Sequence, residues 1–101
     1  MKIVSISDEQ IVIELDGELD MAKAPEARQL FFDAWQMGPG DIVLDCKRLS
    51  YLDSSGVSAI VYLYKSLTQR RLRNLRIVNI SGQPAQLVRV VGFSKLVEEV
   101  S

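Results

Sequence analysis

The sequence predicts an α/β fold in the order β-β-α-β-α-β-α, and two observations carry that prediction. Short runs rich in β-branched residues alternate with longer segments in which apolar residues recur at helical spacing. Glycines and prolines stand at the boundaries between these segments. Because strands separated by helices pair in parallel through right-handed crossovers, we expect a mixed four- to five-stranded sheet with three main helices.

The first two strands are expected at residues 2–7 (KIVSIS) and 10–15 (QIVIEL), joined as a hairpin across Asp8 and Glu9. The first helix follows from Pro25, a favourable first-turn residue, and Gly38-Pro39 stops its periodic pattern. Residues 42–46 (IVLDC) begin as an unbroken apolar run, which is typical of a central strand covered on both faces.

The second helix is expected over residues 55–73. Its apolar positions follow helical spacing at Val57, Ile60, Val61, Tyr64 and Leu67. Arg70, Arg71 and Arg73 complement the negative end of that helix. Residues 75–80 (LRIVNI) predict a strand, and residues 84–91 a short helix ended by Gly92. Residues 95–100 (KLVEEV) fit either an edge strand or a final helical turn.

Length and charge exclude several classes of protein. The 101 residues suit one domain spanning residues 1–101. The net charge is −1, so no bulk field favours nucleic acid or anionic lipid. No apolar run reaches the length of a membrane span, and acidic residues at positions 8 and 9 interrupt the N-terminus before a secretory segment develops. We therefore expect a cytoplasmic protein with no nucleic-acid partner and no membrane insertion.

The inventory of reactive side chains points away from common enzymes. Cys46 is the only cysteine, lies in an apolar run and is expected to be a buried packing residue. The chain has no histidine, so Ser-His and Cys-His catalytic pairs and imidazole metal ligands are absent. We expect no catalytic residue, no metal site and no cofactor.

Three loops are expected to meet at one edge of the sheet, because the carboxyl ends of parallel strands lie together. They are residues 17–24 (GELDMAKA), residues 47–56 (KRLSYLDSSG) and residues 81–84 (SGQP). Asp20, Asp53, Ser54 and Gly82 should therefore share one surface. Each loop also has a plain structural explanation as a turn or a helix cap.

The segment Asp53-Ser54-Ser55-Gly56 opens the second helix, and a cap alone does not explain it. One cap needs one side chain. A glycine in the first turn costs up to about 1 kcal/mol relative to alanine unless a close backbone approach requires it. The segment is neither a nucleophile elbow, since Leu52 stands where the first glycine belongs, nor a P-loop. The interpretation that remains is a serine that another protein modifies or binds. A phosphate on it would be stabilised by the free amides at the start of the helix.

Three segments resemble the STAS-domain anti-sigma factor antagonists. They are GELD at residues 17–20, LSYLDSSGVSAI at residues 49–60 and VGFSKLVEEV at residues 91–100, and together they cover nearly the whole chain in order. The resemblance implies a bacterial partner-switching phosphoprotein that regulates transcription. We expect a protein that is a monomer when free and is not an enzyme. Its unphosphorylated form would bind an anti-sigma factor with serine kinase activity and release the target. Phosphorylation would abolish binding, and a serine phosphatase would reset the protein.

The resemblance also assigns roles to residues. The phosphoacceptor is the hydroxyl residue directly after the aspartate, here Ser54. Asp20 and Asp53 match acidic positions beside it, and Ser55 and Gly56 complete the loop. We also expect Ser58 and the Gly82 loop to belong to the partner-binding surface, together with the Asp20 loop and the exposed start of the second helix. Family members often carry Ser-Pro after the strand that ends near residue 80, where this chain has Ser-Gly-Gln-Pro.

Two other functions stay open at this point. STAS domains also serve as subunits of lipid-transport ABC systems, where they bind the ATPase without phosphorylation. A small serine hydrolase is the third reading, which the missing histidine base disfavours.

Overall fold

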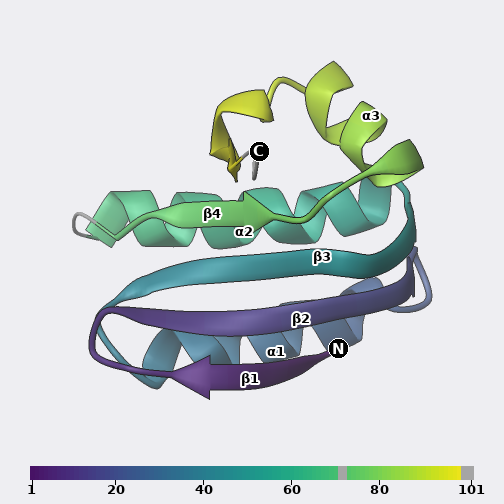
Figure 1. Cartoon of the computed structure of the whole chain (residues 1–101). Helices are drawn as coiled ribbons and strands as arrows, with labels where there is room; N and C mark the ends of the chain where they lie inside the picture. Colours follow the sequence, from purple (N-terminus) through teal and green to yellow (C-terminus); the bar gives the residue numbers. More distant parts are fainter. Residues whose placement is uncertain (71–72, 99–101) are drawn as a thin grey trace.

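The computed structural model describes residues 1–70 and 73–98 and has a five-stranded sheet in the order β1-β2-β3-β4-β5 (Figure 1). The elements follow the chain as β1 (Lys2–Ile6), β2 (Gln10–Leu19), α1 (Ala24–Gln36), β3 (Asp41–Leu52), α2 (Ser54–Arg70), β4 (Leu75–Val78), α3 (Gly82–Val90), the 3-10 helix η1 (Ser94–Leu96) and β5 (Val97–Glu98). Only β1 pairs antiparallel, and the other neighbours are parallel. The predicted α/β order is confirmed.

The N-terminal hairpin is confirmed as well. Ser7 closes its turn, because the Ser7 amide donates to the Gln10 carbonyl at 2.9 Å and the Ser7 hydroxyl accepts from the amides of Glu9 and Gln10. At the other end of the chain both alternatives occur in succession. A 3-10 turn is followed by the two-residue strand β5, and residues 99–101 lie outside the described chain.

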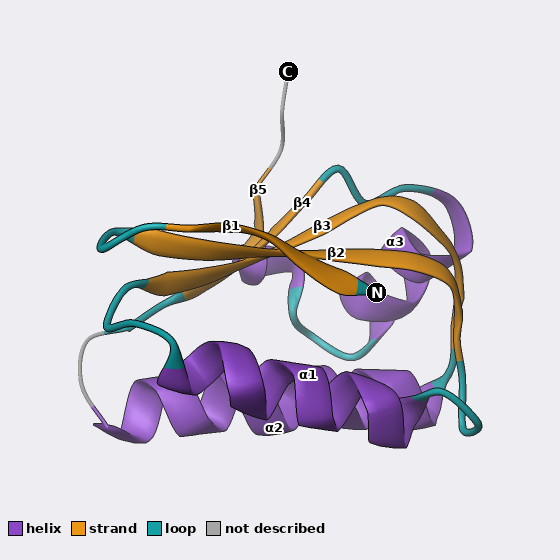
Figure 2. Ribbon diagram, turned by 90° about the horizontal axis from the view of Figure 1, so that it is seen from below, coloured by secondary structure: helices purple, strands orange, loops and turns teal. Residues whose placement is uncertain are grey.

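Strand β3 is central, as predicted, but helices do not cover it on both faces. Figure 2 shows α1 and α2 side by side beneath one face, where Ile42, Leu44 and Cys46 are buried. On the other face Val43 is only 5% exposed, although among the described residues no helix packs over it there. Its register partners Val12 and Arg76 flank it on the two adjacent strands. The side chains of the neighbouring strands therefore shield Val43 from solvent. This explains why residues 42–46 begin as an unbroken apolar run although helices cover only one face of the strand.

Two strands extend beyond their predicted ends. Residues 17–19 and 47–52, which were expected as loops, belong to β2 and β3. The register between these strands shifts between Glu14 and Asp16 and again between Gly17 and Glu18. Such irregularities insert or skip a residue, so the apolar alternation that marks a strand is lost there. The extension brings Leu19 and Leu52, paired in register and both fully buried, to the edge of the sheet.

The core lies between the sheet and the two long helices. Helix α1 contributes Ala27, Phe31 and Ala34, and helix α2 contributes residues at helical spacing that include Leu63 and Leu67. Helix α2 begins at Ser54, one residue before its predicted start. Among the described residues no helix is both long enough and apolar enough to cross a bilayer.

Two sequence predictions about single side chains have different outcomes. Cys46 is 1% exposed, as expected of a packing residue, and burial followed by the charge of Asp45 raises the pKa of its thiol to about 12. The predicted role of Arg73 at the end of α2 is wrong. Its guanidinium donates to the carbonyls of Trp35 at 2.9 Å and Gly40 at 2.8 Å, so it closes the end of α1. Arg71 lies outside the described residues.

Candidate functional site

Asp53 is the N-cap of helix α2. Its Oδ1 accepts a hydrogen bond from the Gly56 amide at 3.0 Å, and its carbonyl accepts from the Val57 amide at 2.9 Å. An N-cap carboxylate satisfies one of the amides left without a partner at the start of a helix. Ser54 and Ser55 are therefore the first two helical residues, with Asp53 in the capping position.

The same carboxylate joins the helix to the loop between β2 and α1. The second oxygen, Oδ2, accepts from the Met21 amide at 3.1 Å, while the Asp53 amide donates to the Leu19 carbonyl at 3.3 Å. Asp20, the neighbouring acid, instead caps its own loop, because its Oδ1 accepts from the amides of Ala22 at 3.0 Å and Lys23 at 3.1 Å. The structure thus brings Asp20 and Asp53 onto adjoining loops, as the sequence predicts.

Gly56 lies where α2 meets the ends of two strands. A Cβ atom built on it would come within 2.5 Å of the Leu19 carbonyl oxygen, 2.6 Å of the Leu52 Cδ1 and 2.9 Å of the Leu19 Cγ. These distances are shorter than van der Waals contact allows. The close backbone approach that the sequence suggested for this glycine is therefore present.

The serines of the segment differ in exposure. Ser54 and Ser58 are exposed, and Ser55 is half-buried. Within the described chain the Ser54 hydroxyl makes no hydrogen bond to another protein group, in contrast to Ser50, whose hydroxyl donates to the Gly17 carbonyl at 3.0 Å. Ser54 therefore lies at the protein surface.

Gln83 is a residue of this edge to which the sequence analysis assigned no role. Its side-chain oxygen accepts from the Leu52 amide at 2.9 Å, and its side-chain nitrogen donates to the Leu52 carbonyl at 2.7 Å. Strand β4 pairs with β3 only as far as Asp45 and ends at Val78, so this side of Leu52 has no strand partner. The amide of Gln83 replaces the missing peptide group.

Gly82 places Gln83 at this position. It has a φ of +62°, a backbone region that glycine adopts without strain, and it is exposed. Figure 1 shows the start of α3 at the same end of the molecule as the start of α2. We call the two hydrogen bonds between the Gln83 side chain and the Leu52 backbone the Gln83 clamp. The sequence carried a signal for it, since glutamine has both a donor and an acceptor and this one stands next to a turn glycine. Its partner could be identified only from the extended path of β3.

A family model, described as the STAS domain, matches residues 2–101 of this chain. The anti-sigma-B factor antagonist of Staphylococcus aureus is 30% identical over 84 residues, which cover 83% of this chain and 77% of that protein. Two solved structures of SpoIIAA have similar folds. The unphosphorylated form has a TM-score of 0.80 at 22% identity, covering 99% of this chain and 87% of that one. The phosphorylated form has a TM-score of 0.78 at 24% identity, covering 99% and 90%. The fold is shared with SpoIIAA, and an exposed serine follows the capping aspartate. Because the family model matches residues 2–101, the chain belongs to the STAS domain family.

Proposed function

We propose that this protein is an anti-sigma factor antagonist that works as a phosphorylation switch, with residues 1–101 acting as one domain. Unphosphorylated, it binds an anti-sigma factor that is also a serine kinase, which releases the kinase's target. Phosphorylation of Ser54 ends that binding, and a serine phosphatase restores it. The observation that carries the proposal is that Ser54, directly after the Asp53 cap, is exposed and that its hydroxyl makes no hydrogen bond within the described residues.

The position of Ser54 allows a phosphate without unfolding. As the first helical residue it lies beside amides that begin α2, and the positive end of the helix dipole favours an anion there. Asp53 already engages the Gly56 amide, so the amides of Ser54 and Ser55 are the donors nearest the added group. SpoIIAA, which shares this fold, has been solved in a phosphorylated and an unphosphorylated form, which supports a switch that leaves the fold intact.

Release follows from charge. A phosphate adds about −1.5 to −2 units beside the Asp53 carboxylate, with Asp20 on the adjoining loop. A partner surface complementary to a neutral hydroxyl would have to bury this charge without a counter-ion, which costs several kcal/mol. Since about 1.4 kcal/mol is a tenfold change, a penalty of about 3 kcal/mol lowers the affinity by roughly two orders of magnitude.

The partner surface is the edge where the three loops meet. We place on it the exposed residues Ser54 and Ser58 of α2, the half-buried Ser55 and the Asp20 and Gly82 loops. Gly56 lies beneath this surface and sets the distance between α2 and the strands. The protein acts in the cytoplasm and is a monomer when free, so this edge is open to the kinase.

The test is to incubate the protein with the purified anti-sigma factor kinase of its own organism and ATP, and to locate phosphate by mass spectrometry. We expect one phosphate on Ser54, and a Ser55→Ala variant should be modified at an unchanged rate. Phosphate on Ser55 in the wild type would contradict the assignment of the acceptor. Stable binding with no phosphate on any residue would contradict the switch itself and favour a transporter-subunit role.

A further inference from the structure

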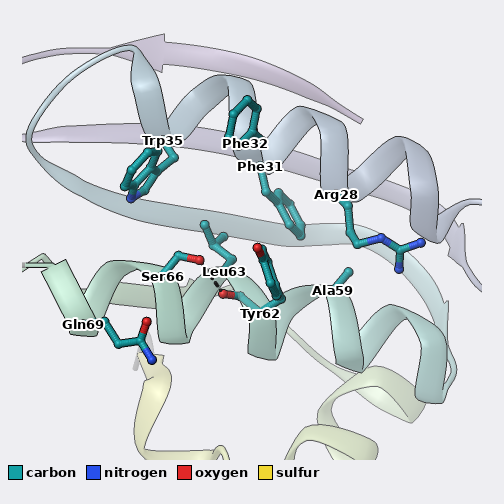
Figure 3. A pocket seen from close by; sticks show the side chains of 9 residues that line it. All are labelled: Arg28, Phe31, Phe32, Trp35, Ala59, Tyr62, Leu63, Ser66 and Gln69. Atoms are coloured by element: carbon teal, nitrogen blue, oxygen red, sulfur yellow. Dashed lines mark hydrogen bonds between the residues drawn. The ribbon is translucent and has the colours of Figure 1, made fainter.

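A hollow of about 250 Å³ lies between the two long helices, lined by residues from α1 and α2 (Figure 3). Its lining includes Phe31, Ala59 and Leu63, which are 2%, 1% and 3% exposed. Ala59 carries only a methyl group and lies at one end of the row of α2 residues that line the hollow. These buried residues belong to the core and make the base of the hollow part of the folded structure.

Aromatic side chains form much of the rest of the lining of the hollow. Phe32 and Tyr62 are 55% and 68% exposed, and Phe32 stacks on Trp35 with ring centroids 6.5 Å apart. Exposed aromatic rings gathered around a concave apolar surface are typical of a binding site. Figure 3 shows Tyr62 pointing from α2 toward α1, across the hollow from Trp35 and Phe31.

The polar groups at the two ends indicate the charge of the ligand. Arg28, near the start of α1, lies at one end of the hollow, and within the described residues its guanidinium makes no ion pair or hydrogen bond. Ser66 and Gln69 lie toward the other end, where the Ser66 hydroxyl donates to the Tyr62 carbonyl at 2.9 Å. None of the described residues that line the hollow carries a carboxylate. An arginine in an aromatic, acid-free site is complementary to a carboxylate.

We propose that this hollow is a binding site for a small aromatic carboxylate, with the ring against Tyr62 and Trp35 and the carboxylate on Arg28. The volume is below the range of about 300–1,000 Å³ usual for drug-sized ligands, so one ring system fits and a long acyl chain does not. This site is separate from the Ser54 edge, and the proposal is independent of the phosphorylation switch.

The experiment uses 3-phenylpropionate as the probe and the uncharged 3-phenylpropionamide as its matched control. Trp35 is the only tryptophan, so its fluorescence reports directly on the hollow, and amide NMR shifts locate the contact. We expect saturable binding of the acid with a Kd on the order of 1 mM, as usual for a ligand of this size. The amide should bind at least about fivefold more weakly, since it loses the charge-assisted hydrogen bond to arginine.

Two variants separate the contribution of the Arg28 charge to binding from that of the apolar lining. Arg28→Gln should lower the affinity for the acid to that for the amide and leave the amide unaffected, because Arg28 is exposed and the substitution spares the fold. Arg89→Gln, an exposed arginine on α3, should change neither affinity. Equal affinity for acid and amide, NMR shifts away from α1 and α2, or no saturation at about 10 mM would overturn the proposal. A concentration-dependent dimer that shifts the same residues without ligand would also overturn it, and would assign the hollow to contact between copies.

Discussion

At the scale of single residues, the packing around Gly56 leaves no room for a side chain. An added methyl group meets the Leu19 backbone at 2.5 Å, and backbone does not move aside as a flexible side chain does. We expect Gly56→Ala to lower the free energy of unfolding by about 2 kcal/mol or more, although alanine is the better helix former. The measurement is urea denaturation.

Gly38→Ala is the matched control for that substitution. The nearest atoms to its added Cβ are at 3.6 and 3.8 Å, which is ordinary contact, and its φ is not positive. Its free energy of unfolding should change by less than about 1 kcal/mol in either direction. Equal losses in the two variants would mean that the contact with Leu19 and Leu52 is not the cause.

The charge at position 54 is expected to determine the affinity for the anti-sigma factor kinase. Ser54→Ala should bind the purified anti-sigma factor kinase constitutively and accept no phosphate, because the neutral surface is kept. Ser54→Asp should stay folded at the helix start, where an acid is favourable, and bind roughly a hundredfold more weakly. Titration calorimetry measures both affinities, and undiminished binding by Ser54→Asp would argue against electrostatic release.

At the scale of elements, the exposed face at the start of α2 should recognise the partner without supporting the fold. Ser58 is exposed, so Ser58→Arg removes no packing and should change the free energy of unfolding by less than about 0.5 kcal/mol. We expect the same variant to weaken binding to the kinase, since a bulky cation would stand in the contact. Parallel losses of binding and stability would indicate that Ser58 has a structural role.

Helix α3 is attached to the end of β3 through the Gln83 amide. Gln83→Ala leaves the Leu52 amide and carbonyl without these partners, which should cost about 1–3 kcal/mol. Hydrogen exchange of the Leu52 amide should become faster, whereas Gln86→Ala, at an exposed position of α3, should leave it unchanged. Unaltered exchange in Gln83→Ala would mean that the clamp is not formed in solution.

Sequence reasoning succeeded for elements whose pattern is local. The hairpin at residues 2–15 and both long helices follow from residues near one another in the chain. The glycine in the first turn of α2 indicated a close approach, but not that Leu19 is the backbone it approaches. Sequence reasoning failed where the pattern depends on distant partners. Register shifts conceal the last residues of β2 and β3, and the Gln83 clamp needs a strand end that lies 31 positions away in sequence.

At the scale of the whole molecule, the buried thiol of Cys46 couples folding to pH. Its pKa is raised to about 12 in the folded protein because burial disfavours the thiolate, against an ordinary value of 9.0. Between these two values the unfolded chain loses the proton and the folded chain keeps it. The stabilisation is therefore fully present below about pH 9 and is lost as the pH rises toward 12, by up to about 1.4 kcal/mol per pH unit.

The difference between wild type and Cys46→Ala isolates this effect. Alanine leaves a small cavity that lowers stability at every pH, whereas all other side chains are common to both proteins. We expect the wild type's advantage over Cys46→Ala, measured by urea denaturation, to be constant from pH 7 to about pH 8.5 and to shrink steadily up to about pH 10.5. A constant difference over the whole range would mean that the folded chain opens enough to let Cys46 ionise at its ordinary pKa.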